Sequence, residues 1–293
     1  MKIIKSLLNI ILAFIIIFAV FLLIGINILE NRFLNKEYVL LKMEEIQFYE
    51  QISREVQSGF EEYIYQSGLP EDTIKDLFEE ELLRKDVNNL IDCLYEGTDI
   101  KLSDEVVRKT LDTKIQEYLN AQNKKLSSEE QKNIEKFEEL IVQEYKENVN
   151  VSTTLYTKGH IIIKKVEEIV NKIGKLPEIL FIGLIVFIVL INLKDLLVAI
   201  NFLSISSLSI GILLKLGVSL VFTNIDFDNL LILAKSVSNL GANIAKENLY
   251  MISDIGNIFI VCGIVGIFIV AILKKTDKKI KPVRRSINNK FKD

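Results

Sequence analysis

The chain has 293 residues, of which 49% are hydrophobic and 26% are charged, and its formal net charge is −3 at pH 7. Two cysteines and one histidine leave little scope for disulfide or zinc chemistry. The hydrophobic residues gather in four long runs around an acidic segment. This layout predicts an all-α integral membrane protein with four transmembrane helices and a large all-helical extracytoplasmic domain on a two-helix stalk.

The first apolar run predicts transmembrane helix 1 at residues 6–29. Its 24 positions carry no charge, enough to cross a hydrocarbon core of roughly 30 Å at about 1.5 Å per residue. A cleaved signal peptide is the alternative, but its apolar region would be about 7–15 residues followed by a small-x-small cleavage site. The run is longer and ends at Leu29-Glu30, so we expect an uncleaved anchor with residues 1–5 in the cytoplasm.

Residues 30–175 predict the extracytoplasmic domain and its stalk. Neither Gly nor Pro occurs from Asn27 to Ser58, so we expect one long helix that leaves the membrane and ends near Ser67-Gly68. A second helix leads into the next span, and both carry apolar residues at helical spacing. The two stripes are Leu34, Tyr38, Leu41, Phe48, Ile52, Val56, Phe60 and Tyr63, and then Leu155, Gly159, Ile162, Val166, Ile169 and Ile173. We expect them to pack antiparallel as a coiled-coil stalk.

Capping signals predict shorter helices between the two stalk helices. The N-terminal signals are Pro70 in a first turn, Asp86 and Ser103 as N-caps, and the capping box of Ser127 with Glu130. Gly97 is expected to end the helix that Asp86 begins. No run of four or more residues alternates convincingly as a strand does, so the domain is expected to be all-helical.

The rest of the chain predicts three further spans, with helix 2 at 176–193, a cytoplasmic turn at 194–195, helix 3 at 196–222 and helix 4 at 255–273. The extracytoplasmic loop at 223–254 has an amphipathic pattern made by Leu230, Leu233, Val237, Leu240 and Ile244. It either lies on the headgroups or packs on protein. Because Lys235 and Lys246 are its only basic residues, it lacks the cationic face of a typical lipid-binding helix, and packing on protein is favoured.

The distribution of Lys and Arg predicts the orientation, because these residues are enriched at the cytoplasmic ends of spans. Lys2 and Lys5 precede helix 1, and the basic tail at 274–293 holds nine basic residues against two aspartates. Residues 31–175 carry 21 basic and 30 acidic side chains. We therefore expect a multi-pass cell-membrane protein with both termini in the cytoplasm and residues 31–175 outside. The abundance of Ile, Lys and Asn favours a bacterial cell envelope.

Three features outside the spans could carry chemistry, and each has a simpler explanation. An acidic cluster could attract a divalent cation, but on a helix its carboxylates point in several directions, as on a solvated face. The cluster comprises Glu71, Asp72, Asp76, Glu79, Glu80 and Glu81. His160 and Cys93 are single residues without companions at metal-ligand spacing. We therefore predict no catalytic, cofactor-binding or metal-binding residue, no cofactor and no nucleic-acid partner.

Polar residues within spans are costly and often mark a transport path. Lys215 is the only charge well inside a span. Its stem can reach the headgroups, or it lines a pore or pairs with another group in the membrane. No acidic residue lies deep in a span, which disfavours a proton-coupled or sodium-coupled transporter and an aspartyl intramembrane protease.

Other small and polar residues predict how the spans pack. Four asparagines lie near span ends, where hydration is easy: Asn9, Asn192, Asn201 and Asn257. Two small-x-x-x-small pairs mark faces where helices can approach closely, namely Ser207 with Gly211 and Cys262 with Gly266. Cys93 and Cys262 fall in different compartments under this topology, so we expect no disulfide between them.

These patterns favour a non-enzymatic envelope protein whose outer helical domain senses a signal or docks a protein partner. The expected partners are the lipid bilayer and a protein of the membrane or envelope. The alternative is a membrane subunit of a transport system, because four spans with the largest outer loop between the first two resemble the layout of FtsX-type permeases, which associate with ABC ATPases. The chain departs from that layout at 194–195, where those permeases have a substantial cytoplasmic stretch, and in its purely helical outer domain. An enzyme acting on lipid or cell wall is a third class, without a motif.

Overall fold

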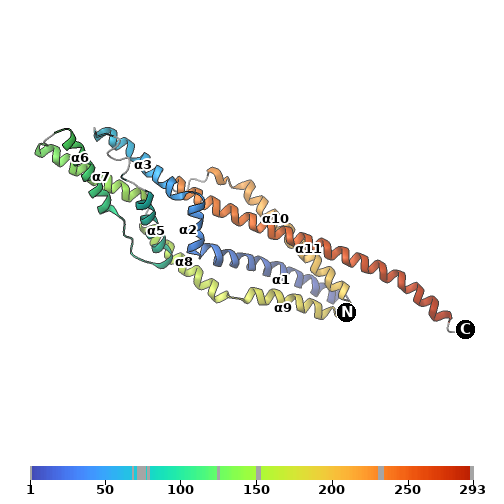
Figure 1. Cartoon of the computed structure of the whole chain (residues 1–293). Helices are drawn as coiled ribbons and strands as arrows, with labels where there is room; N and C mark the ends of the chain where they lie inside the picture. Colours follow the sequence, from blue (N-terminus) through green and yellow to red (C-terminus); the bar gives the residue numbers. More distant parts are fainter. Residues whose placement is uncertain are drawn as a thin grey trace. The chain divides into compact units, whose positions relative to one another are not determined.

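The computed structural model describes residues 2–67, 69–70, 77, 80–123, 126–149, 153–229 and 234–290. Every regular element in these ranges is a helix, which confirms the all-α prediction (Figure 1). The chain folds as two compact units. We call residues 1–29, 170–227 and 245–293 the apolar unit, and residues 30–169 with 228–244 the polar unit.

The apolar unit contains helices that are long and apolar enough to cross a membrane. Its elements are α1 (Lys2–Ile28), α9 (Leu176–Ile191), α10 (Leu196–Asn224) and the part of α11 (Lys235–Lys290) that starts at residue 245. The described chain has four helical stretches that are long and apolar enough to cross a membrane, and each of these elements belongs to one of them. The prediction of four span-length helices is therefore confirmed. A turn at residues 192–195 joins α9 to α10, and in it the Asp195 amide donates to the Asn192 carbonyl at 2.8 Å.

α1 packs on α9 and α10 through a small apolar core. The core consists of Leu12, Ile16, Ala19 and Val20 from α1, Leu184 and Ile188 from α9, and Ala199, Ile210 and Leu214 from α10. Many other large apolar side chains point outward, and Phe14 and Ile179 are each 68% exposed. So large an apolar exterior is unfavourable in water and suits a lipid environment.

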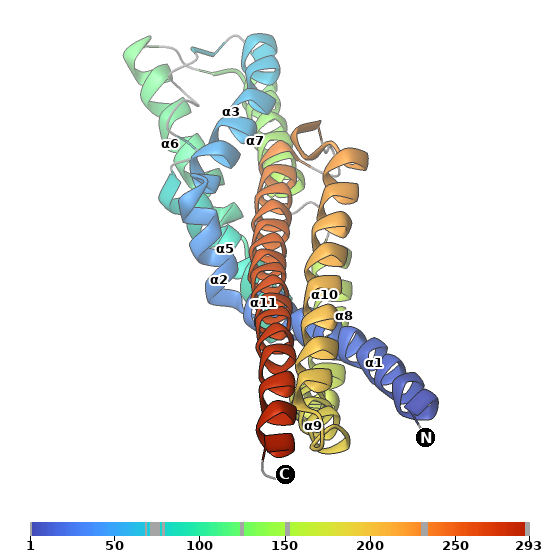
Figure 2. The same cartoon turned by 90° about the vertical axis from the view of Figure 1, so that its right-hand side faces the viewer.

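α10 and α11 run antiparallel with their backbones close together (Figure 2). A Cβ added at Gly211 would lie 2.5 Å from the Gly256 carbonyl oxygen. Next to this contact, the Ser207 hydroxyl donates to the Phe259 carbonyl at 2.7 Å. The predicted packing role of Ser207 and Gly211 is therefore confirmed.

The facing positions on α11 are glycines, not the predicted cysteine. A Cβ at Gly263 would lie 2.7 Å from the Leu208 amide nitrogen, and one at Gly266 would collide with the Ser204 hydroxyl. Gly266 is confirmed as a contact residue. The prediction for Cys262 is wrong, because its side chain is exposed and the next residue along the helix faces α10 instead.

The polar unit has a larger core shared by several helices. It comprises α2 (Lys36–Glu45), α3 (Phe48–Ser67), α5 (Glu80–Glu96), α6 (Asp104–Ala121), α7 (Ser128–Val149), most of α8 (Thr153–Ile173) and the first turns of α11. A π-helix at Leu29–Phe33 precedes α2, and a 3-10 turn at Phe227–Asn229 follows α10. Fully buried core residues include Met43, Phe60, Leu83, Leu90, Leu111, Ile115, Ile141 and Tyr145. The predicted α3 stripe from Phe48 to Phe60 therefore faces this core.

Several predicted helix ends coincide with observed ones. Ser127 and Glu130 form the capping box, with Ser127 N donating to Glu130 Oε2 at 2.8 Å and Glu130 N donating to Ser127 Oγ at 3.2 Å. Gly97 follows the end of α5 with φ +74°, a value that favours glycine. Asp86 is not an N-cap as predicted, because α5 already begins at Glu80. The helix predicted from Pro70 falls largely on residues outside the described ranges.

The predicted single helix from the first span to Ser67 is wrong. It breaks at Asn35, whose side chain caps α2 by accepting from the Tyr38 amide at 3.0 Å, and again at Gln47, which has φ +55°. The second predicted stalk helix also ends before the membrane helix that follows. Gly174 has φ +50° between α8 and α9, a conformation that glycine adopts at little cost. A break therefore separates α1 from α2, and another separates α8 from α9.

α8 packs on the C-terminal end of α5, which differs from the predicted stalk pairing with the first stripe. Gly159 abuts Leu94, where any Cβ would collide, and the His160 ring lies over Gly97. α3 packs on α5 and α7. The predicted α8 stripe is only partly covered, since Ile162 is 55% exposed while its neighbour Ile163 is 6% exposed.

The amphipathic pattern before the last span forms the beginning of α11, which continues without a break to Lys290. Val237 and Leu240 pack against the polar-unit core, so the preference for packing on protein is confirmed for these residues. Leu230 and Leu233 lie outside the described residues. The loop and the span predicted as separate elements are parts of one helix.

Candidate functional site

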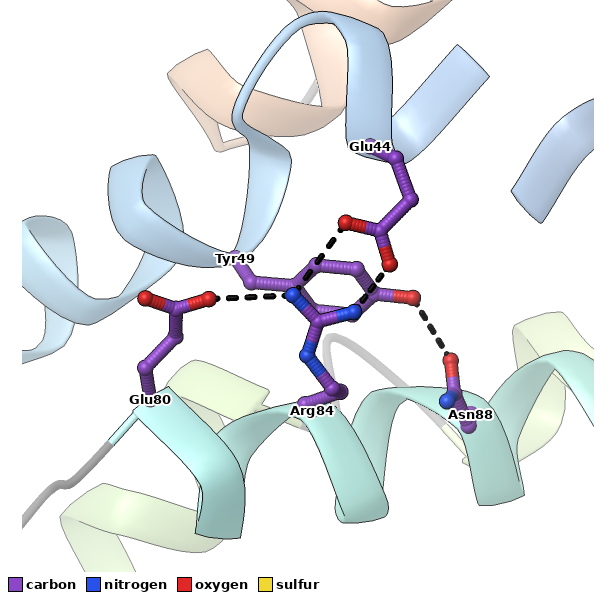
Figure 3. Close-up of polar contacts among 5 residues, drawn as sticks. All are labelled: Glu44, Tyr49, Glu80, Arg84 and Asn88. Carbon is purple, nitrogen blue, oxygen red and sulfur yellow. Dashed lines mark hydrogen bonds and ion pairs between the residues drawn. The ribbon is translucent and has the colours of Figure 1, made fainter. Parts of the chain in front are cut away.

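Arg84 of α5 joins α2, α3 and α5 in an exposed polar cluster (Figure 3). Its guanidinium lies 4.1 Å from the centroid of the Tyr49 ring, pairs with both Glu44 carboxylate oxygens, and donates to Glu80 at 3.0 Å. The Tyr49 hydroxyl donates to Asn88 Oδ1 at 2.7 Å. The two carboxylates raise the pKa of Arg84, and burial followed by the charge of Glu44 raises the pKa of Tyr49. The cluster is a structural joint, to which each exposed ion pair contributes about 0–1 kcal/mol.

Asp86 is a buried carboxylate that joins three helices of the polar unit. It lies in α5 with no exposed surface and accepts from the Ser103 amide at 2.7 Å, the Ser103 hydroxyl at 2.6 Å and the Tyr145 hydroxyl at 2.7 Å. Ser103 is the N-cap residue of α6, and Asp86 of α5 accepts from both its backbone amide and its hydroxyl. Burial and the bond to Asp86 raise the pKa of Tyr145. Three donors satisfy this carboxylate, and the site is structural.

His160 connects α8 to the end of α5. Its Nδ1 lies 3.1 Å from the Leu94 carbonyl oxygen, and because a carbonyl only accepts, Nδ1 must carry the proton and donate. The ring fills the space above Gly97, where a Cβ would come within 2.7 Å of Nε2. The single histidine is therefore half-buried and packed.

The N-terminus of α11 is held by polar side chains of α3, which we call the α11 cap site. The Glu55 carboxylate accepts from the Ser236 amide at 2.7 Å and from the Ser236 hydroxyl at 2.8 Å. One turn later, Asn239 donates to Gln51 Oε1 at 2.9 Å. Ser236 has no exposed surface. A carboxylate here satisfies an otherwise unpaired amide and opposes the positive end of the helix dipole.

In the apolar unit, Asn9 of α1 and Asn192 at the end of α9 form a buried pair. Asn192 donates to Asn9 Oδ1 at 3.0 Å and to the Ile188 carbonyl at 2.8 Å, and Asn9 donates back to Asn192 Oδ1 at 3.4 Å. The expectation that these two are hydrated at span ends is wrong, because they are 1% and 0% exposed. The pair joins two span-length helices by the neutral amide contacts common between membrane helices.

Lys215 lies at the edge of the uncharged layer that α10 and α11 share. A Cβ at Gly256 would lie 3.4 Å from Lys215 Cγ, so the two residues are level and the glycine makes room for the lysine stem. Asp254 is two residues away along α11. The uncharged runs that this register matches are 196–214 and 255–273, each 19 residues long, or about 28 Å at 1.5 Å per residue. Lys215 therefore follows directly after the uncharged run of α10, level with the beginning of the uncharged run of α11.

The remaining candidates do not converge on a reactive centre. Cys93 is buried, which raises the pKa of its thiol, and both cysteines are free. In the acidic cluster, Glu80 pairs with Arg84, and residues 71–76 and 79 lie outside the described ranges. Among the residues that the structure describes, no group of three or more His, Cys, Asp or Glu side chains could hold a metal ion.

Sequence reasoning missed the polar contacts that matter most for the architecture. Asp86 was interpreted as a local cap, and neither Glu55 nor Gln51 was singled out. Their partners lie 181 and 188 residues away along the chain, so no local spacing could reveal them. Comparison with known proteins adds no relative, since no family model, curated protein or solved structure matches this chain.

Proposed function

We propose that the protein is a non-enzymatic multi-pass protein of the cell envelope, whose polar unit lies outside the cytoplasm and acts as a sensing or protein-docking module. The observation that carries the proposal is the α11 cap site together with the unbroken helix that follows it. α11 begins against α3 in the polar unit and, without a break, includes the uncharged run 255–273. The same helix thus belongs to a folded polar body and to a membrane-spanning element.

This arrangement offers a physical route for a signal. A partner that changes the position of α3 changes how Glu55 and Gln51 hold the first turns of α11. Because the helix is continuous, a shift or rotation at Ser236 is passed along its backbone, and helix shifts of about 1–2 Å are a known form of signalling. The docking partner is a protein of the membrane or envelope, and the lipid bilayer is the second partner.

The charge distribution supports the proposed orientation. One end of the apolar unit gathers basic residues: Lys5 near the start of α1, Lys194 in the turn between α9 and α10, and Lys274-Lys275 after the uncharged run of α11. Basic residues mark the cytoplasmic side of membrane spans. In a Cys93→Ser, Cys262→Ser background, Lys132→Cys in α7 should react with a membrane-impermeant maleimide in intact cells. Lys194→Cys should react only after lysis. Both lysines are exposed in the structure, and labelling in the reverse order would overturn the proposal.

The cap site is tested by removing it without touching the spans. The Glu55→Ala, Ser236→Ala variant loses a helix cap worth about 1 kcal/mol, so the amides of the first turns of α11 should exchange hydrogen faster. Asn243→Ala, on an exposed position of the same helix, is the matched control and should leave that exchange unchanged. Equal exchange in both variants would remove the cap site from the proposed route.

Docking is tested by photo-crosslinking in intact cells. A photoreactive residue at Val106 or Leu140, which are 49% and 43% exposed on α6 and α7, should capture one and the same envelope or membrane protein. Exposed Lys109 and Lys136 on the same two helices are the control positions. An absence of any adduct in correctly inserted protein would count against docking on these two helices.

The short turn at 192–195 distinguishes this proposal from the transport alternative. FtsX-type permeases have a substantial cytoplasmic stretch between their second and third spans, whereas α9 and α10 are joined here by four residues. Co-purification of the full chain with an ATPase would favour the alternative over sensing or docking.

A further inference from the structure

α8 has one packed side and one exposed side. Its packed side includes Ile163, which is 6% exposed, and the contacts of Gly159 and His160 with the end of α5. On the other side, Ile162 and Ile169 are 55% and 54% exposed. The helix is therefore anchored to the polar unit and still presents an apolar edge.

The exposed side of α8 carries a row of lysines between isoleucines, and the exposed Glu168 lies beside this row. Lys158, Lys165 and Lys172 recur every seven residues, so they form one row along the helix, and all three are exposed. At 100° per residue, Ile162 and Ile169 lie along one flank of this row. Ile161, 49% exposed, lies on the other flank. We call these six residues the lysine–isoleucine face.

This face differs in charge from the segment to which it belongs. Residues 31–152 contain 16 basic and 28 acidic side chains, whereas residues 153–175 contain five lysines and two glutamates. The first turns of α11 also pair an apolar stripe with polar residues, but they hold only Lys235 and Lys246, and their apolar side packs on protein. α8 and the first turns of α11 therefore differ both in charge and in how far protein covers their apolar side.

The face is also tethered close to a membrane-spanning helix. α8 ends at Ile173 and α9 begins at Leu176, with the positive-φ Gly174 between them. Ile162 is 14 residues before Leu176, so it lies within about 20 Å of the start of α9 whatever angle the two helices make. Ile169 and Lys172, seven and four residues before Leu176, are the members of the face nearest to the start of α9.

We propose that the lysine–isoleucine face binds the surface of the membrane that α9 enters, with the lysines on anionic lipid phosphates and the isoleucines at the boundary of the acyl chains. Lysine stems lie along apolar surface while their ammonium groups reach the headgroups, which suits a lysine row flanked by isoleucines. Attraction of basic side chains to anionic lipid supplies the charge complementarity.

Two features of the chain favour the bilayer over a protein helix as the partner of the lysine–isoleucine face. A helix partner would need acidic residues at matching seven-residue intervals, whereas a layer of lipid phosphates meets the lysines in any register. The short connection to α9 also limits how far the face can lie from lipid. A second copy of the chain remains an outcome that the experiment distinguishes.

The chain contains no tryptophan, so one introduced tryptophan reports its surroundings without background. The full-length Ile162→Trp variant is reconstituted in vesicles of phosphatidylcholine and phosphatidylglycerol whose acyl chains are brominated near the headgroup. Its fluorescence should be quenched, as should that of Phe14→Trp on the exposed surface of α1. Leu140→Trp, on the exposed surface of α7, is the matched control in the polar unit and should not be quenched.

The lysines are tested in the same vesicles. Replacing Lys158, Lys165 and Lys172 by Gln should lower quenching at position 162 by about twofold or more and leave quenching at position 14 unchanged. Equal fluorescence of Ile162→Trp and Leu140→Trp would overturn the proposal, and so would disulfide crosslinking of two copies through Ile162→Cys without quenching. Unchanged quenching in the lysine variant would overturn the role given to the phosphates.

Discussion

The two units bury polar groups in different ways. The polar unit buries a carboxylate, Asp86, and surrounds it with three donors from two other helices. The apolar unit buries neutral groups, namely the Asn9–Asn192 pair and hydroxyls such as Ser206, which donates back to the Phe202 carbonyl of its own helix at 2.8 Å. A charge is costly in hydrocarbon, so the span-length helices use the polar groups that need the least solvation.

The units also differ in how helices approach each other. Large side chains such as Phe60 and Tyr145 fill the centre of the polar unit. Between α10 and α11, glycines let the backbones meet, as at Gly211 and Gly256. In water, large side chains supply the hydrophobic driving force. In lipid that force between helices is absent and close van der Waals contact replaces it, so one type of packing cannot substitute for the other.

The largest expected loss of stability comes from removing the buried carboxylate of the polar unit. Asp86→Ala leaves the Ser103 amide and two hydroxyls without their acceptor, so it should destabilise the polar unit by about 3 kcal/mol. Tyr145→Phe removes one donor and should cost about 1 kcal/mol. The measurement is protease resistance of α6 and α7 in increasing urea, in the full-length protein in detergent. Equal losses from the two variants would mean that the carboxylate does not organise α6.

A smaller loss of stability is expected when the contact between α10 and α11 in the apolar unit is disturbed, with the polar unit left intact. Gly211→Leu forces side-chain atoms into the Gly256 backbone and should lower stability by about 2 kcal/mol through overpacking. Gly217→Leu is the matched control, because a Cβ there meets nothing within 4 Å. The thermal midpoint in detergent should fall for the first variant only, with the urea resistance of α6 and α7 unchanged. A similar drop for both glycines would remove the close contact as its cause.

The smallest effect concerns pH and the polar unit alone. Burial, followed by the charge of Asp112, raises the pKa of Glu138. Its ionisation therefore opposes folding above that raised pKa, and the penalty disappears as the pH falls below the pKa of the unfolded chain. Glu138→Gln should stabilise the polar unit at pH 7 by less than about 1 kcal/mol and have no effect near pH 4.

A matched control for Glu138 has the opposite sign. The bond with Lys146 lowers the pKa of Asp104, so this carboxylate stabilises the fold above its unfolded pKa and ceases to do so as the pH falls through the lowered value. Asp104→Asn should therefore destabilise the polar unit at pH 7. Urea unfolding at both pH values measures both variants, and effects of the same sign would show that burial does not govern Glu138.

How much of the fold could be predicted depended on how far along the chain each signal reaches. The capping box at Ser127 and the glycine after α5 were predictable because their contacts span three or four residues. The cap at Asn35 is equally local, but no Gly or Pro accompanies it, so the sequence predicted a continuous helix there. Gln47 adopts a positive φ without any such residue type, so composition offered no signal.

The polar contacts between helices could not be predicted from spacing at all. Asp86 meets a serine 17 residues away and a tyrosine 59 residues away, and only the packed helices bring them together. The apolar stripe of α8 also depended on contacts between helices that spacing does not show. Its period was right, but which half of the helix would be covered depended on α5, and Ile162 was left outside.

The Asn9–Asn192 pair also sets an order of events in time. The two residues are 183 positions apart, and synthesis at about 5–20 residues per second separates their appearance by about 10–40 s. During this interval α1 has its amide without the partner that later covers it. The Asn9–Asn192 contact therefore forms only after the ribosome has synthesised α9.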